Sequence, residues 1–230
     1  MLMAKLIIAF HIFFLLSFSS FSQNSLSTSG KAIINEIGDT IILRGMGLGG
    51  WMVQEGYMMA PGGFSSTQYQ IRDRLIELIG LQETNIFYDN WLSNHVRKID
   101  IDSMKQWGFN LVRAPIHYNL FTQPIENESY PFAYTEKEKG FQLLDSLLSW
   151  CKENEIYLMI DLHAAPGGQG YNADISDYDP SKPSLWESEY NQHKTVELWK
   201  RIANRYKDEE WIAGYDLINE PNWDIPEGAL

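Results

Sequence analysis

The sequence is short of cysteine and of basic residues. Cys151 is the only cysteine among 230 residues, so no internal disulfide can form, and 18 Lys and Arg stand against 30 Asp and Glu, a formal net charge of −12. Because nucleic-acid affinity rests largely on cations that neutralise phosphates, this balance argues against a nucleic acid as partner. Aromatic residues, in contrast, make up 13% of the chain. Such a composition predicts a folded protein with a sizeable core and favours a neutral, hydroxyl-rich ligand that contacts aromatic rings and carboxylates.

Long apolar runs are also lacking, except for one at the amino terminus. Lys5 precedes the run Leu6 to Leu16, which is broken only by His11 and followed by small residues. The run has about eleven residues, whereas a helix that crosses a bilayer needs roughly 20. This pattern is typical of a secretory signal peptide over residues 1–22, with a retained anchor as the alternative. We therefore expect a secreted protein, extracellular or periplasmic, with no membrane contact once the signal is removed.

From Phe109 onward, apolar strands alternate with helices. Three strands that are apolar along most of their length are predicted over Phe109–Ala114, Ile156–Leu162 and Trp211–Ile218, and the segments Gly140–Glu153 and Ser188–Tyr206 between them have helical spacing. This alternation indicates an α/β fold with a parallel sheet covered on both faces.

The spacing of the strands predicts the architecture. The strands begin about fifty residues apart, and a further strand is expected after Ile41–Arg44, so the chain provides four strand–helix units. A (β/α)8 (TIM) barrel has eight such units. The predicted fold is therefore a TIM barrel of which this chain supplies about the first four units. Upstream, the sequence predicts a hairpin around Gly38-Asp39, with strands Ala32–Glu36 and Thr40–Arg44, and helices over Ile71–Ile79, Ile86–Val96 and Ile101–Trp107.

Polar residues gather where the predicted strands end. Because the carboxyl ends of parallel strands form one rim of a barrel, where the active sites of such barrels lie, we expect these residues to converge. They fall in four stretches of the chain: Trp51 and Glu55; Arg113, His117 and Tyr118; Asp161 and His163; and Asn219, Glu220 and Trp223.

The same stretches carry four motifs in order. They are Leu43-Arg44-Gly45 leading into Gly49-Gly50-Trp51, then Gly108-Phe109-Asn110-Leu111-Val112-Arg113-Ala114-Pro115, Asp161-Leu162-His163 and Asn219-Glu220-Pro221. Together they resemble the first half of a family 5 glycoside hydrolase, the large cellulase family, and are nearest to its exo-glucanase-like and cellulase-like branches. The resemblance covers about Ile34 to Trp223 and marks residues 23–230 as part of a catalytic domain that stops after the fourth strand.

The resemblance implies a retaining glycosidase, which needs one protonated and one ionised carboxyl and no metal or other cofactor. Glu220 would protonate the departing glycosidic oxygen and then deprotonate water, while Asn219 would bind the sugar 2-hydroxyl. Arg113 would hold the nucleophilic carboxylate, and His163 would line the site. The family's nucleophilic glutamate comes from the seventh strand and cannot be assigned in this chain.

Several of these residues have simpler explanations. Arg113 could form a structural ion pair with Asp161. His163 could be a core histidine or, with His117 and His193, a metal ligand, although no HExxH-type spacing supports a metal.

Five residues are predicted to bind substrate. Trp51 and Trp223 would stack on sugar rings, Glu55 would accept a sugar hydroxyl unless it is an ordinary surface acid, and His117 and Tyr118 would line the cleft.

Two functional hypotheses follow. The first is the amino-terminal part of a secreted, monomeric hydrolase for β-glucans such as cellulose, inactive by itself because it lacks the nucleophile. The second is a non-catalytic carbohydrate-binding or decayed barrel fragment. In either case the expected partner is a polysaccharide or oligosaccharide.

Overall fold

A computed structural model describes residues 25–61, 63 and 65–224. The predicted signal peptide, residues 1–22, lies outside the described residues. The chain divides into two compact units between Ile41 and Ile42. Each unit is described by itself below.

The first unit contains a small antiparallel sheet. Strand β1 (Ser27–Ser29) pairs with β2 (Ala32–Ile34) across a turn in which Gly30 has a φ of 59°. The predicted turn at Gly38 also forms, with Asn35 accepting hydrogen bonds from the backbone of Gly38 and Asp39. The pairing that follows it is limited to one bridge between Ile34 and Thr40, so the second predicted strand, Thr40–Arg44, does not form. Strand β2 pairs instead with β1, which the sequence analysis did not predict.

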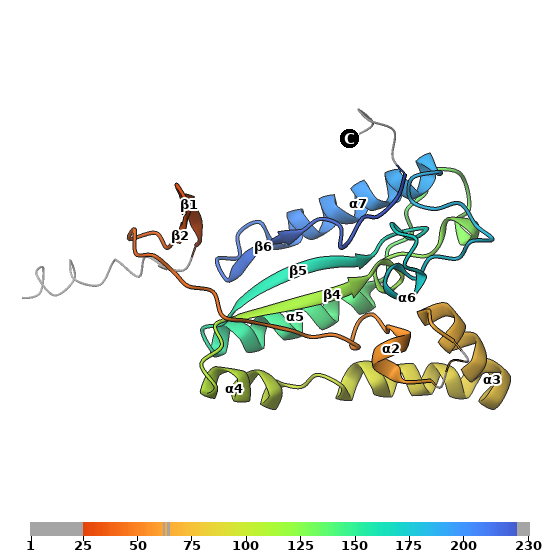
Figure 1. Ribbon diagram of the computed structural model, residues 1–230, viewed down its shortest axis with the longest axis horizontal. Helices are drawn as coiled ribbons and strands as arrows, with labels where there is room; N and C mark the ends of the chain where they lie inside the picture. Colours follow the sequence, from red (N-terminus) through yellow and green to blue (C-terminus); the bar gives the residue numbers. More distant parts are fainter. Residues whose placement is uncertain (1–24, 62, 64, 225–230) are drawn as a thin grey trace, which may run out of the picture. The chain divides into compact units, whose positions relative to one another are not determined.

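The second unit is built on a four-stranded parallel sheet whose strand order follows the chain (Figure 1). The strands are β3 (Gly45–Gly47), β4 (Leu111–His117), β5 (Tyr157–Ala164) and β6 (Ile212–Asp216). Sequential, all-parallel strand order is the order of a TIM barrel. The predicted α/β class and parallel sheet are therefore confirmed, with strand boundaries shifted by a few residues.

Helices separate the strands as the periodicity predicts. The structure contains α2 (Gly56–Met59), α3 (Gln68–Asn94), α4 (Lys98–Gln106), α5 (Glu138–Glu153), α6 (Ala173–Ser176) and α7 (Glu189–Tyr206), with 3-10 turns at Tyr118–Leu120 and Ile125–Asn127. The α3 span holds the two helices predicted over Ile71–Ile79 and Ile86–Val96, separated by a kink at Gly80, where the backbone is not helical (φ 81°). In the described part of the chain, no helix combines the length and apolarity needed to cross a bilayer.

The core lies where the two central strands meet the helices. Alternate residues of the strands, Val112, Ala114 and Ile116 on β4 and Leu158, Ile160 and Leu162 on β5, are fully buried in one apolar cluster with the inner face of α5. Side chains of a strand point to opposite faces in turn, so the intervening residues, among them Arg113, Asp161 and His163, share the other face. This alternation, together with the parallel register, brings the predicted polar residues to one side of the sheet.

A buried ion pair fixes α7 to the long connection between β4 and α5. Lys194 of α7 contacts the carboxylate of Glu128, and only 1% and 4% of their side chains are exposed. The ammonium group also donates to the hydroxyl of Thr122 at 3.1 Å and to the carbonyl of Ala133 at 3.3 Å. Burial alone would raise the pKa of Glu128, but Lys194, Thr135 and Gln123 together lower it to about 2.

We expect substitution of Lys194→Met to destabilise the protein by about 3–5 kcal/mol, because it leaves the Glu128 carboxylate buried without its counter-charge. Chemical denaturation monitored by circular dichroism measures this change. The matched control is Lys200→Met, also on α7, because its pair with Glu197 is solvent-exposed and contributes about 0–1 kcal/mol. Equal unfolding free energies for the two variants would contradict the role assigned to Lys194.

Candidate active site

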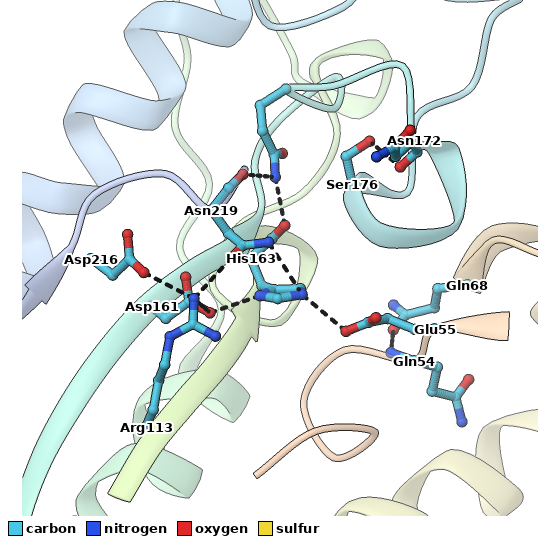
Figure 2. A network of polar contacts seen from close by, with 11 residues as sticks. Gln54, Glu55, Gln68, Arg113, Asp161, His163, Asn172, Ser176, Asp216 and Asn219 are labelled. Carbon is cyan, nitrogen blue, oxygen red and sulfur yellow. Dashed lines mark hydrogen bonds and ion pairs between the residues drawn. The ribbon is translucent and has the colours of Figure 1, made fainter. Parts of the chain in front are cut away.

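The predicted rim forms at the carboxyl ends of β4, β5 and β6. Figure 2 shows Arg113 from β4, Asp161 and His163 from β5, and Asp216 and Asn219 from the end of β6, arranged around one another. Glu55 reaches His163 from the segment that precedes α2. That segment is held beside β4 by a parallel bridge between Met52 and Ile116.

Arg113 is the charge centre of this group. Its Nη2 atom lies 3.0 Å from Asp161 Oδ2, 2.9 Å from Asp216 Oδ2 and 2.8 Å from Asn219 Oδ1. The structural ion pair with Asp161 is thus present, but it is one part of a larger contact. A guanidinium suits this position because it stays charged: the two N–H groups of Nη2 donate to Asp216 and Asn219, and the charge also attracts Asp161.

His163 lies between two carboxylates. Its Nδ1 is 2.7 Å from Asp161 Oδ2, and its Nε2 is 2.9 Å from Glu55 Oε1. Two carboxylates at these distances favour the imidazolium form of the ring, in which both nitrogens donate, although burial raises the pKa of Asp161. Burial lowers the pKa of His163, but the two carboxylates outweigh it and raise that pKa to about 9.

Glu55 is buried rather than an ordinary surface acid. Burial tends to raise its pKa, but hydrogen bonds from His163 and Tyr57 outweigh that effect, and the pKa of Glu55 is lowered. The hydrogen bond to Glu55 in turn raises the pKa of Tyr57 to about 12. Glu55 therefore carries a negative charge beside the predicted sugar site. Its predicted contact with a sugar hydroxyl stays a prediction.

Asn219 and Glu220 lie shortly after β6, which ends at Asp216. The backbone N–H of Asn219 donates to the carbonyl of Leu162 at 3.0 Å, which keeps the chain beside the end of β5. Asn219 is buried, whereas Glu220 is exposed. Glu220 has a φ of 43°, in the left-handed region that non-glycine residues rarely occupy. Asn219 thus contacts both Arg113 and His163, and Glu220 is the next residue along the chain; its predicted role as acid/base stays a prediction.

An aromatic cluster lies next to them. Trp223 stacks on Tyr171 with ring centroids 4.1 Å apart, and Tyr178 meets Trp223 edge-on at 5.2 Å. Tyr171 comes from the loop after β5 and Trp223 from the loop after β6, so the pair joins two neighbouring rim loops. Tyr171 remains 53% exposed. The predicted stacking of Trp223 on a sugar stays a prediction. Tyr171 is the aromatic residue that stacks on Trp223 within the protein.

The burial of Trp51 argues against its predicted stacking role. The indole is 2% exposed, and its Nε1 donates to the carbonyl of Leu92 on α3 at 2.8 Å. Both faces of the ring are covered, so no sugar can stack on it in this structure. Trp51 instead packs in the core and attaches the glycine-rich segment to α3.

Both ring nitrogens of His117 are engaged within the protein, and its predicted place in the lining of the substrate cleft stays a prediction. His117 is buried, its Nδ1 accepts from the backbone N–H of Asn119 at 3.1 Å, and its Nε2 is 2.8 Å from Asp177. Asp177 also accepts from the backbone of Tyr69, so it fastens the loop after β5 to β4 and α3. Tyr118 is half-buried against the His117 ring, with centroids 5.0 Å apart, and burial raises the pKa of its hydroxyl.

The described residues contain no group of three or more His, Cys, Asp or Glu side chains that could hold a metal ion. His117 and His163 are engaged by carboxylates, and His193 packs against Phe132. The alternative of a histidine metal site therefore has no support in this part of the chain.

Three polar residues of the site were missed by the sequence analysis: Asp216, Gln169 and Asp177. Asp216 ends an apolar strand on the same face as Asp161, with which it is paired in register, so the strand pattern could have identified it. Gln169 and Asp177 lie in an irregular loop, where no periodicity indicates which side chains turn inward.

Comparison with known proteins identifies the class that this fold and site define. Residues 71–227 match the family described as cellulase (glycosyl hydrolase family 5), so the chain belongs to that family. A β-xylosidase of Phanerodontia chrysosporium is 36% identical over 197 residues, which cover 85% of this chain and 39% of the relative. A probable glucan 1,3-β-glucosidase A of Aspergillus niger is 30% identical over 193 residues, which cover 82% of this chain and 42% of the relative.

Solved structures agree on the fold. The rutinosidase from Aspergillus niger aligns with a TM-score of 0.61 at 18% identity, over 77% of this chain and 48% of that protein. The chain therefore spans about two fifths to one half of the proteins that it matches. This coverage agrees with the prediction of a partial TIM barrel.

The geometry at His163 predicts an unusual titration. Because its pKa is raised, the ring stays an imidazolium at pH 7, and the stability that this charge contributes is present below about pH 6.5 and lost as the pH rises through about 9. Substitution of Glu55→Gln should lower the pKa of His163, since it removes one of the two carboxylates. NMR titration of the labelled ring measures both values.

Glu209→Gln is the matched control for this titration, because Glu209 pairs with Lys152 and takes no part in the site. It should leave the His163 titration unchanged. A neutral His163 ring at pH 7 in the unsubstituted protein would refute the assignment.

Proposed function

We propose that this chain is part of a secreted retaining glycosidase that cleaves β-linked glucans, with Glu220 as its acid/base residue. The observation that carries the proposal is the placement of Glu220 directly after Asn219, whose side chain is held by Arg113 beside the His163 imidazolium. Family membership supports the reaction class. The relatives, a β-xylosidase and a probable glucan 1,3-β-glucosidase, support a β-linked substrate.

The contacts of Asn219 support its proposed role at the sugar 2-hydroxyl. Arg113 donates to Oδ1 at 2.8 Å and Nδ2 lies 3.4 Å from His163 Nε2, so these two contacts set the orientation of the amide and leave Nδ2 a donor for substrate. A donor at the 2-hydroxyl oxygen stabilises the oxocarbenium-like transition state of glycoside cleavage. Arg113 thus fixes which end of the amide faces the sugar.

The charges of the site support the proposed division of labour. Glu220 would give its proton to the glycosidic oxygen as the bond to the leaving group breaks, and would later take a proton from the attacking water. A second, ionised carboxylate would form the covalent glycosyl intermediate, about 5–5.5 Å from Glu220. In the family this carboxylate comes from a later strand than the four described, which is why the test below uses the full-length gene product.

Two further points belong to the proposal. The apolar run in residues 1–22 supports export with removal of a signal peptide, and the mature protein would act as a monomer on a polysaccharide or oligosaccharide. Exposed Tyr171 with Trp223 supports a sugar-binding surface beside Glu220, because the C–H face of a pyranose packs on aromatic rings.

The test is the substitution Glu220→Gln in the full-length gene product. Hydrolysis of cello-oligosaccharides and laminari-oligosaccharides should fall by about 10²–10⁴-fold, the contribution of a positioned general acid. Glu209→Gln is the matched control, since Glu209 pairs with Lys152 and takes no part in the site, and it should keep activity within about twofold. An unsubstituted protein without activity on any β-glycoside, or a Glu220→Gln variant with full activity, would refute the proposal.

A further inference from the structure

Gln169 connects the ends of two neighbouring strands through its side chain. It is fully buried, and its Nε2 donates to the carbonyl of His163 at 2.7 Å and to the carbonyl of Asn219 at 2.9 Å. Its Oε1 accepts from the backbone N–H of Ala165 at 3.1 Å. Both donors and the acceptor of this amide are therefore used, which is how a buried amide avoids a desolvation penalty.

The bond to Asn219 bears on the acid/base residue. The carbonyl of Asn219 belongs to the peptide group that joins Asn219 to Glu220. A donor bound to this oxygen therefore fixes the orientation of the peptide plane that precedes Glu220. Glu220 then takes a φ of 43°. For a residue other than glycine such a conformation costs about 1–3 kcal/mol and persists only where the surroundings impose it. The Gln169 amide is a contact that can impose it.

The same loop also holds the chain on the other side of Glu220. Gly170 forms a parallel bridge with Asn222, and the Asn222 side chain accepts from the backbone N–H of Tyr171 at 2.7 Å. A Cβ atom on Gly170 would lie 2.2 Å from Asn222 Oδ1, so only glycine permits this approach. Residues 169–171 therefore form hydrogen bonds with the chain both before Glu220, at Asn219, and after it, at Asn222.

The loop itself is anchored. The indole of Trp186 donates to the backbone carbonyl of Gln169 at 2.9 Å, and Ser176 of α6 donates to the carbonyl of Gly170 at 2.9 Å. These contacts fix the backbone of Gln169, while its side chain binds the chain at the ends of β5 and β6.

We propose that Gln169 is a positioning residue that aims the carboxyl group of Glu220. This inference rests on the proposed function, since it assigns Gln169 a role in the proton transfer made by Glu220. Gln169 itself does not touch the reacting atoms. Its amide keeps the peptide group between Asn219 and Glu220 in the orientation from which the left-handed Glu220 conformation follows.

The kinetic test compares leaving groups in the full-length gene product. Departure of a poor leaving group needs protonation, whereas dinitrophenolate departs without it. In Gln169→Leu, kcat/KM should fall by about 10²-fold for a cello-oligosaccharide and by less than about threefold for a dinitrophenyl glucoside. Loss of folded protein alone would lower both values equally, so an equal loss would overturn the proposal.

Two further variants separate the loss of the Gln169 donors from a general loss of packing or stability. Gln169→Glu keeps the shape and the Oε1 acceptor but, when ionised, lacks the donors, so it should show the same selective loss and regain activity relative to the unsubstituted protein as the pH falls. Gln192→Leu is the matched control, because this exposed glutamine also donates to a backbone carbonyl, that of Trp186, but touches neither strand end. It should leave both substrates unaffected.

A crystal structure of a Gln169 variant tests the positional claim independently of activity. Glu220 should leave the left-handed region, with a negative φ, in the variant. An unchanged Glu220 would overturn the inference. An unsubstituted protein that is inactive on both substrates would instead count against the proposed function, and the Glu220 conformation would then decide the role of Gln169.

Discussion

The polar site depends on one guanidinium group. Parallel strands bring Asp161 and Asp216 side by side in register, and carboxylates placed this close repel one another when they leave water. Arg113 lies within 3.0 Å of both and also holds the amide of Asn219. Without that charge the strand ends could not approach in this register at low energetic cost. Arg113 therefore stabilises the pairing of these strands as well as the site.

The charges extend from Arg113 through the site as an alternating series. The Arg113 cation contacts Asp161, Asp161 contacts the His163 imidazolium, and His163 contacts Glu55. Each charge has an opposite neighbour at hydrogen-bond distance, which offsets the burial of Asp161, His163 and Glu55, while Arg113 keeps some contact with solvent. It also joins three parts of the chain, the segment before α2, β4 and β5, and so couples the geometry of the rim to its electrostatics.

The sequence predicts most of the sheet because burial leaves a direct trace in it. Strands β4 and β5 contain the predicted apolar runs, although β4 continues through Pro115 to His117, and the polar residues within or directly after these runs include Arg113, Asp161 and His163. The hairpin partner β1 was missed because Ser27, Thr28 and Ser29 carry no apolar pattern. Trp51 was misassigned because a tryptophan in a glycine-rich segment looks the same in sequence whether its ring is exposed or donates to Leu92. The role of Gln169 is invisible for a similar reason, since its partners are backbone carbonyls that any residue would provide.

The left-handed backbone at Glu220 lowers the stability of the fold but presents a carboxyl group at the rim. Glycine is the residue that this φ would select on conformational grounds alone. A carboxylic acid at the position means that the fold gives up some of its own stability in order to present that group at the rim. Substitution by glycine would relieve this cost, as it would at Ala60, Phe132, Glu155 and Asp177, which also have a positive φ.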